Sequence, residues 1–119
     1  MEYSITVTRS IGLVNFINGN TAIDIVQVSG GMLRSARCVF TRSEMRDITT
    51  TLEEMLWKDK DNRSVEFREA GFKMYMIMKS TTEGIKFMMP TKDHLLASII
   101  LGRAEAIDLY ETLKECYMV

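Results

Sequence analysis

The segment LVNFINGNTAIDIVQV, residues 13–28, constrains the fold more than any other part of the chain. Asn18-Gly19 tolerates the positive φ angles of a type I′ turn. Apolar residues alternate with polar ones on both sides of this dipeptide, which is the pattern of two paired strands. The segment therefore predicts a β-hairpin that begins a mainly antiparallel protein.

Further strands and two helices follow from the patterns around this hairpin. Ile5 and Val7 alternate with threonines, which predicts a strand before the hairpin, and LRSARCVF at 33–40 predicts one after it. Thr41-Arg42-Ser43-Glu44 reads as a capping box, so a helix is expected at 43–57. Pro90 ends the last predicted strand, and Thr91 is expected to cap a second helix that runs to about residue 116.

The stretch FKMYMIMKSTTEGIKFMM, residues 72–89, predicts a second hairpin with two different faces. Phe72, Met74, Met76, Met78, Ile85, Phe87 and Met89 alternate onto one face and are expected in the core. The other face carries Lys73, Tyr75, Ile77, Lys79, Lys86 and Met88. A change of parity between Phe67 and Phe72 predicts a turn or bulge at Glu69-Ala70-Gly71.

The 119 residues are expected to form a single domain, residues 1–119, with a core that needs no disulfide or metal. MEYSITV has neither a basic segment nor an apolar segment typical of a signal peptide, and the longest apolar run, 95–101, is too short to cross a membrane. We therefore expect a soluble protein in the cytoplasm of its host cell, with no membrane partner.

Charge is segregated along the chain although the net charge is only −1. Four basic and two acidic side chains lie in residues 1–42, and four basic and one acidic in 73–92. The segment 43–72 carries five basic and eight acidic side chains, and 93–119 two and five. Positive charge thus follows the predicted strands and negative charge the predicted helices, which suggests a basic sheet surface.

Catalytic and metal-binding chemistry finds little support in the residue pattern. The two cysteines, Cys38 and Cys116, are expected to be buried, inert thiols, and the single histidine, His94, is expected on the surface. Gly30-Gly31 lacks the spacing of a phosphate-binding loop. We expect no enzyme activity, no catalytic residue, no metal, no cofactor and no small-molecule substrate.

The basic face of the second hairpin indicates nucleic-acid binding. Single-stranded DNA needs cations along its phosphates and flat or soft side chains under its bases. Lys73, Lys79 and Lys86 supply the cations, and Tyr75, with Ile77 and Met88 beside it, supplies the stacking surface. Arg34, Arg37 and Arg42 are expected to extend this track. The alternative explanation is an ordinary solvent-exposed sheet face, on which lysines prevent aggregation through the strand edges.

Three strands, a helix and two strands (β-β-β-α-β-β) is the element order of the OB-fold, here with an added C-terminal helix. With the lysine–tyrosine face, this order over residues 4–89 resembles the small single-stranded-DNA-binding proteins of bacteriophages. The resemblance implies an α+β fold with an OB-like antiparallel barrel, a homo-oligomer, and a role in DNA replication or recombination. The better-known bacterial single-stranded-DNA-binding proteins carry a Gly/Pro-rich acidic tail that recruits replication partners. This sequence has LKECYMV at the corresponding place, so we do not expect recruitment through such a tail.

Two other interpretations remain open at this stage. For the fold, helices capped at Thr41 and Thr91 after runs of strands resemble the duplicated β-meander plus helix of whirly-type single-strand binders. For the function, ten methionines and acidic helices suit a protein-binding module, such as a phage inhibitor of a host protein. A structural virion subunit is a third possibility.

Overall fold

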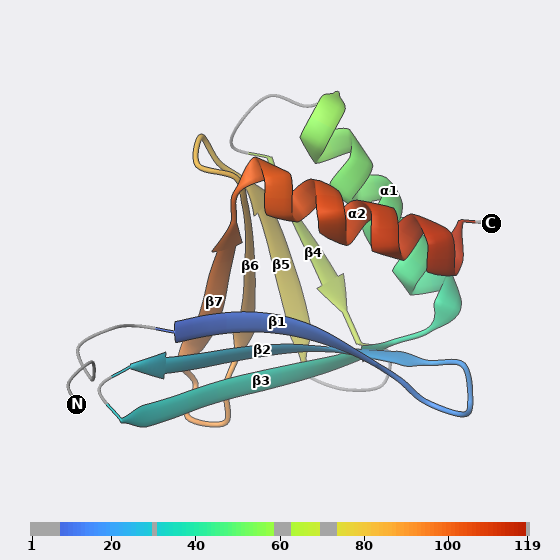
Figure 1. Ribbon diagram of the computed structural model, residues 1–119. Helices are drawn as coiled ribbons and strands as arrows, with labels where there is room; N and C mark the ends of the chain where they lie inside the picture. Colours follow the sequence, from blue (N-terminus) through green and yellow to red (C-terminus); the bar gives the residue numbers. More distant parts are fainter. Residues whose placement is uncertain (1–7, 30, 59–62, 70–73, 119) are drawn as a thin grey trace.

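The computed structural model describes residues 8–29, 31–58, 63–69 and 74–118, and its elements follow the order β-β-β-α-β-β-β-β-α (Figure 1). The fold is therefore α+β with antiparallel sheets, as the sequence predicts. The elements are β1 (Thr8–Asn15), β2 (Thr21–Ser29), β3 (Met32–Phe40), α1 (Arg42–Trp57), β4 (Ser64–Arg68), β5 (Tyr75–Ser80), β6 (Ile85–Pro90), β7 (Leu96–Leu101) and α2 (Arg103–Tyr117).

The predicted hairpin at 13–28 is present as β1 and β2, but its turn is longer than a type I′ turn. Asn15 pairs with Thr21, and the Phe16 amide donates to the Asn20 carbonyl at 2.9 Å. Three residues therefore form the loop, and of these Gly19 has a positive φ, of 89°. Loops of three residues commonly place glycine at this position. The strand predicted around Ile5 and Val7 lies outside the described residues.

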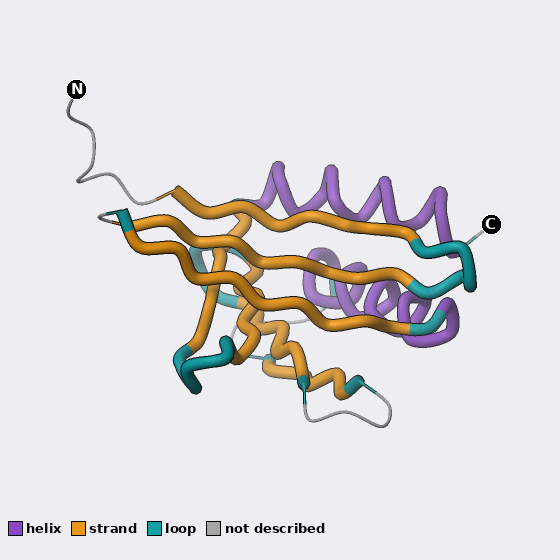
Figure 2. The backbone as a smooth tube through the Cα atoms, turned by 90° about the horizontal axis from the view of Figure 1, so that it is seen from below, coloured by secondary structure: helices purple, strands orange, loops and turns teal. Residues whose placement is uncertain are grey.

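The strands form two separate antiparallel sheets, in the orders β1-β2-β3 and β4-β5-β6-β7. In Figure 1 the four-stranded sheet stands upright and the three-stranded sheet runs across its lower end. Seen from below, α1 lies behind the three-stranded sheet, and α2 runs along the β1 edge of that sheet (Figure 2). The described strands do not close into a barrel, so the expectation of an OB-like barrel is wrong in this respect.

The second helix begins later than predicted, because residues 96–101 form β7. Ala97, Ile99 and Leu101 alternate into the core, while Ile100 lies on the opposite face. A short apolar run fits a helix or a strand equally well, and pairing with β6 decides for the strand. Gly102, expected inside the helix, is its N-cap, and its amide donates to the Glu105 side chain at 3.2 Å.

The first helix forms as the sequence predicts. The Glu44 amide donates to the Thr41 hydroxyl at 3.2 Å, and the Thr41 amide donates to the Glu44 carboxylate at 2.8 Å. This reciprocal pair satisfies two of the amides that a helix N-terminus leaves free. One stripe of the helix is buried against the sheets, at Met45, Ile48, Leu52, Met55 and Leu56.

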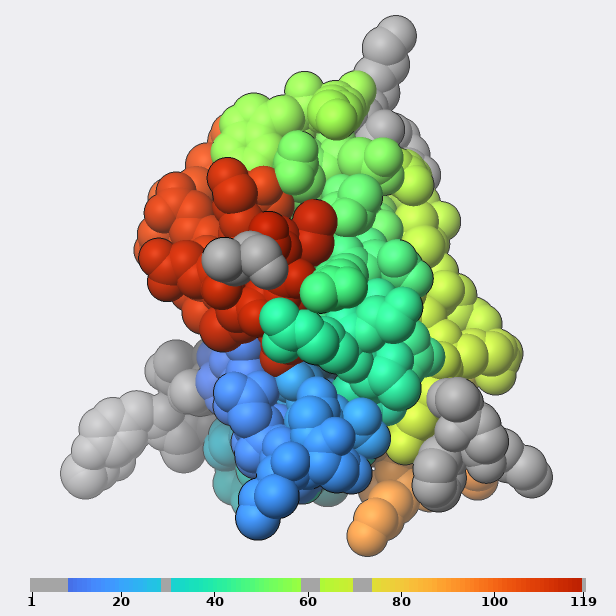
Figure 3. Space-filling view, turned by 90° about the vertical axis from the view of Figure 1, so that its right-hand side faces the viewer, coloured from blue at the N-terminus to red at the C-terminus, as the bar shows by residue number. Residues whose placement is uncertain are grey.

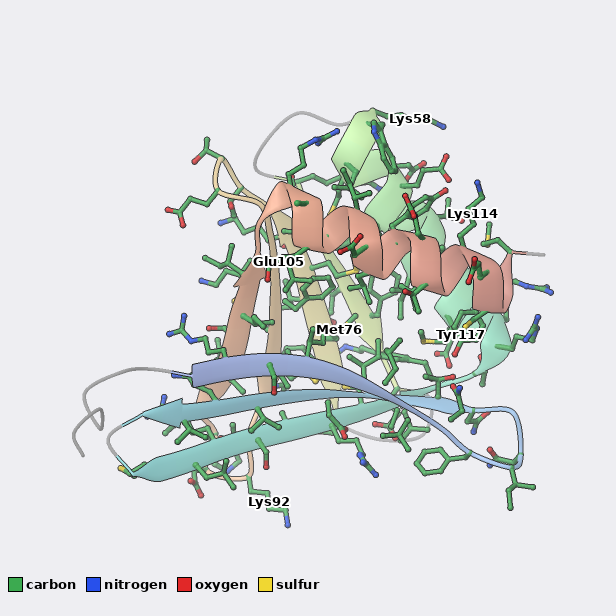
Figure 4. All side chains as sticks on the ribbon, in the orientation of Figure 1. Lys58, Met76, Lys92, Glu105, Lys114 and Tyr117 are labelled. Carbon is green, nitrogen blue, oxygen red and sulfur yellow. The ribbon has the colours of Figure 1, made fainter. Side chains whose placement is uncertain are left out.

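A shared hydrophobic core joins both sheets and both helices. Ile25, Leu52, Phe87 and Leu113, from four different elements, are all at most 2% exposed. Met76 lies in the same interior, between the four-stranded sheet and the helices (Figure 4). Nine methionines lie in the described residues, and the expectation that most of them are core residues holds for five, whereas Met32 and Met118 are exposed: the buried ones are Met45, Met55, Met76, Met78 and Met89.

A polar cluster fixes the end of α2 to the β1–β2 hairpin. The hydroxyl groups of Tyr117 and Thr21 form a buried hydrogen bond, and both lie within hydrogen-bonding distance of the Asn15 side-chain oxygen, at 3.3 Å and 3.1 Å. The hydroxyl that accepts in the first bond is the one that donates to Asn15. Figure 3 shows this end of α2 directly above the hairpin. No helix in the described part of the chain is long and apolar enough to cross a membrane.

Candidate nucleic-acid interface

The second predicted hairpin is present as β5 and β6, and its two faces alternate as expected. Met76, Met78, Ile85, Phe87 and Met89 are buried on the inner face. The other face of these strands is half-buried and looks away from the helices. We call it the outer face and define it by Tyr75, Ile77, Lys79, Lys86, Met88 and Pro90.

Two lysines lie directly opposite each other on the outer face. Lys79 of β5 pairs with Lys86 of β6, and their next neighbours across the sheet are Ser64 and Ile100. Neither lysine forms an ion pair with any residue that the structure describes. Like charges on opposed strand positions destabilise a sheet unless an anion lies near them. This row therefore concentrates uncompensated positive charge on one side of the sheet.

Tyr75 lies at the other end of the outer face and is half-buried. The guanidinium of Arg68, on the neighbouring strand β4, lies 5.2 Å from the centre of the Tyr75 ring, within the range of a cation–π contact. Arg68 also forms an ion pair with Glu66 at 2.6 Å. Between this ring and the two lysines lie Ile77 and Met88, which pair with each other.

Arg68 joins this surface although the sequence analysis did not select it. Its position could have been found from alternation, since Glu66 and Arg68 share the parity of β4 that faces solvent. Lys73, which the sequence predicts on this face, lies outside the described residues. The predicted bulge at 69–71 also falls mostly there, although the Glu69 amide donates to the Met74 carbonyl at 3.1 Å.

The structure does not bring the three predicted arginines onto the outer face. Arg34 and Arg37 lie on opposite faces of β3, because they differ in parity. Arg37 donates two hydrogen bonds to Asp24, at 2.6 Å and 2.8 Å, and these bonds raise the pKa of Arg37. Arg42 begins α1, with its guanidinium 5.6 Å from the centre of the Tyr117 ring.

The two thiols differ from each other, which corrects the expectation that both are buried. Cys38 is buried in β3, and its burial, helped by the charge of Glu69, raises its pKa to about 12. A thiol with such a pKa is protonated and unreactive at neutral pH. Cys116 is exposed on α2.

The outer face can therefore offer two ammonium groups that form no ion pair with the described residues, a tyrosine ring and the apolar side chains of Ile77 and Met88 in one continuous area. No family model matches this sequence, and no curated protein is detectably similar to it.

Proposed function

We propose that this protein binds single-stranded DNA without catalysing a reaction, and that the outer face is its binding surface. The observation that carries the proposal is the Lys79–Lys86 pair, which shares its sheet face with the Tyr75 ring. The lysines neutralise phosphates, while Tyr75, Ile77 and Met88 contact bases. Such contacts tolerate any sequence, because every base has a flat face. Three further points remain predictions made from the sequence: a role in replication or recombination, a phage origin, and assembly into a homo-oligomer.

For the fold, we propose the whirly-type arrangement in place of the OB-fold. The order β-β-β-α followed by β-β-β-β-α supports a repeat of strands and a helix. In each half the strands form one antiparallel sheet in which neighbours in sequence are neighbours in space. The two helices then pack side by side within one core.

A charge-reversal pair tests the proposal. Lys79→Glu combined with Lys86→Glu should weaken binding of a fluorescent oligo-dT by at least tenfold, on the order expected when two phosphate contacts become repulsive. Fluorescence anisotropy at low salt measures this change.

The matched control is Lys58→Glu combined with Lys114→Glu, which changes the net charge by the same amount. Both control lysines are exposed and lie on or next to the helices, away from the outer face (Figure 4). The control should bind like the wild-type protein. Equal losses in both double variants would mean that binding depends on overall charge, and the outer face would lose its assigned role.

A second function, protein binding, is favoured by a different surface. Leu33, near the start of β3, is 66% exposed, and its cross-strand partner Val28 on β2 is exposed on the same face. Met32 is 70% exposed on the opposite face of the same sheet end. Exposed apolar side chains grouped on a sheet are typical of protein-binding sites. A stoichiometric complex with a host protein that survives nuclease treatment, together with no affinity for oligo-dT, would favour this function over DNA binding.

A further inference from the structure

A cavity of about 430 Å³ lies where the three-stranded sheet meets the loop between β6 and β7. One wall belongs to β2 and β3, on the side of their sheet that faces away from the helices. The opposite wall belongs to the residue before β5 and to the loop after β6. The side chains that the argument below uses are Val26, Ser35, Arg37, Met74, Pro90 and Lys92.

This pocket continues the outer face. Pro90 belongs to both, since it ends β6 on the outer face and also lines the pocket. The paired part of β5 and β6 ends at Ile77 and Met88, and Tyr75 and Pro90 lie two residues beyond it, on the same outer face. Met74, which precedes Tyr75, lines the pocket as well. A strand that follows the outer face from Lys79 toward Tyr75 therefore reaches the pocket next.

The pocket combines apolar walls with charged groups, of which Asp24 and Arg37 pair with each other and Lys92 supplies the remaining positive charge. Val26, Met74 and Pro90 provide apolar surface, and the Ser35 hydroxyl provides a hydrogen-bonding group at the side. Lys92 is exposed and forms no ion pair within the described part of the chain, and it lies below the three-stranded sheet (Figure 4). Arg37 is held in place by Asp24. The volume is within the range of small-molecule sites, roughly 300–1,000 Å³.

The loop that forms one wall carries two costly features. His94 has a φ of 63°, a left-handed conformation that is uncommon for a residue with a side chain. The Thr91 hydroxyl oxygen is buried and has no hydrogen-bond partner among the described residues. Unusual backbone angles cluster at functional sites, and a buried polar group without a partner calls for an explanation such as a bound ligand or water.

We infer that this pocket holds one nucleotide of the bound DNA strand. The base lies between Val26, Met74 and Pro90, and its edge reaches the Ser35 hydroxyl. Lys92 contacts the phosphate of the same nucleotide. A base in a single strand is unpaired, so only the small free energy of unstacking it from its neighbours opposes its insertion into the pocket. This inference rests on the proposed function, since the strand is delivered along the outer face.

Two substitutions test the pocket without touching the outer-face lysines or Tyr75. Ser35→Phe fills the pocket from an exposed position on an edge strand, and Lys92→Ala removes the cation. Each should weaken oligo-dT binding about tenfold, as expected for the loss of one stacked or charge-paired nucleotide. The controls are Ser43→Phe, at an exposed position on α1 that is not part of the pocket wall, and Lys58→Ala.

Photo-crosslinking gives a second readout that a folding defect would not imitate. An oligo-dT that contains 5-iodouracil should crosslink wild-type protein at Met74 itself, which tandem mass spectrometry distinguishes from the adjacent Tyr75 of the outer face, and Ser35→Phe should abolish the Met74 product. If circular dichroism shows that Ser35→Phe is unfolded, the oligo-dT affinity of Lys92→Ala and the site of the wild-type crosslink test the inference instead.

The outcomes separate this inference from the proposed function. No binding of oligo-dT by the wild-type protein overturns both. A second outcome is binding that depends on Lys79 and Lys86 while Ser35→Phe and Lys92→Ala bind oligo-dT with the same affinity as their controls. That result overturns the nucleotide-binding role of the pocket and leaves the role of the outer face unchanged. Losses confined to the two pocket variants and to the Lys79–Lys86 variant support both.

Discussion

At the scale of single residues, Tyr75 is the side chain whose surroundings say most about binding. Its ring is half-buried on the outer face, and Arg68 contacts the ring at 5.2 Å while it is paired with Glu66. The contact with the guanidinium restricts the motion of the ring. A ring that is already ordered loses little entropy when a base stacks on it.

Tyr75→Ala should weaken binding of oligo-dT by about 1–3 kcal/mol, the usual effect of removing one stacking aromatic residue. Tyr75→Phe keeps the ring and should bind within a few tenths of a kcal/mol of the wild-type protein, since stacking does not use the hydroxyl. Fluorescence anisotropy measures both. An unchanged affinity in Tyr75→Ala would show that bases do not contact this ring.

The arginines show where residue-level reasoning fails. Arg37 has the right type of charge, but Asp24 pairs with it through two hydrogen bonds, and this partner comes from the neighbouring strand. The alternation of β3 alone places Arg34 and Arg37 on opposite faces of the sheet, and this can be seen in the sequence. The pairing of Asp24 with Arg37 cannot, because it depends on the register between two strands. Lys79 and Lys86 were correctly grouped because a single hairpin determines their register.

At the scale of elements, the hairpins and α1 could be predicted because their signals are local. The alternation at 74–89 and the capping box at Thr41 depend only on neighbours in sequence. β7 could not be predicted in this way, since LASIIL suits a strand only when β6 is available as a partner. The pocket was missed for the same reason, because its walls come from different sheets.

The turn between β5 and β6 makes a close contact that a substitution can test. Gly84 has a φ of 150°, and a Cβ at this position would lie 1.9 Å from the Leu101 carbonyl oxygen. Gly84→Ala should therefore lower the free energy of unfolding by at least about 2 kcal/mol, because backbone atoms must move. Urea denaturation followed by circular dichroism measures this.

Gly12→Ala is the matched control, since a Cβ on Gly12 would meet nothing within 4 Å. We expect it to unfold at the same urea concentration as the wild-type protein or slightly higher. Equal stabilities of the two alanine variants would contradict the contact between the turn and the end of β7.

At the scale of the whole molecule, charge segregation along the chain becomes segregation in space. The described acidic residues of the helices, such as Glu53 and Glu111, lie on the side of the molecule that carries α1 and α2, whereas Lys79 and Lys86 lie on the far side of the four-stranded sheet. A protein with a net charge of −1 can therefore present a positive surface to an anionic strand.

The salt dependence of oligo-dT binding tests the central claim most directly. Lys79, Lys86 and Lys92 should together release the counterions of about three phosphates, so a plot of log affinity against log salt concentration should have a slope of about −2. Lys79→Glu combined with Lys86→Glu should make that slope markedly shallower. Saturable binding with the predicted slope would support the assignment of the outer face. An affinity that does not change with salt, or no binding at the lowest salt concentration, would contradict it.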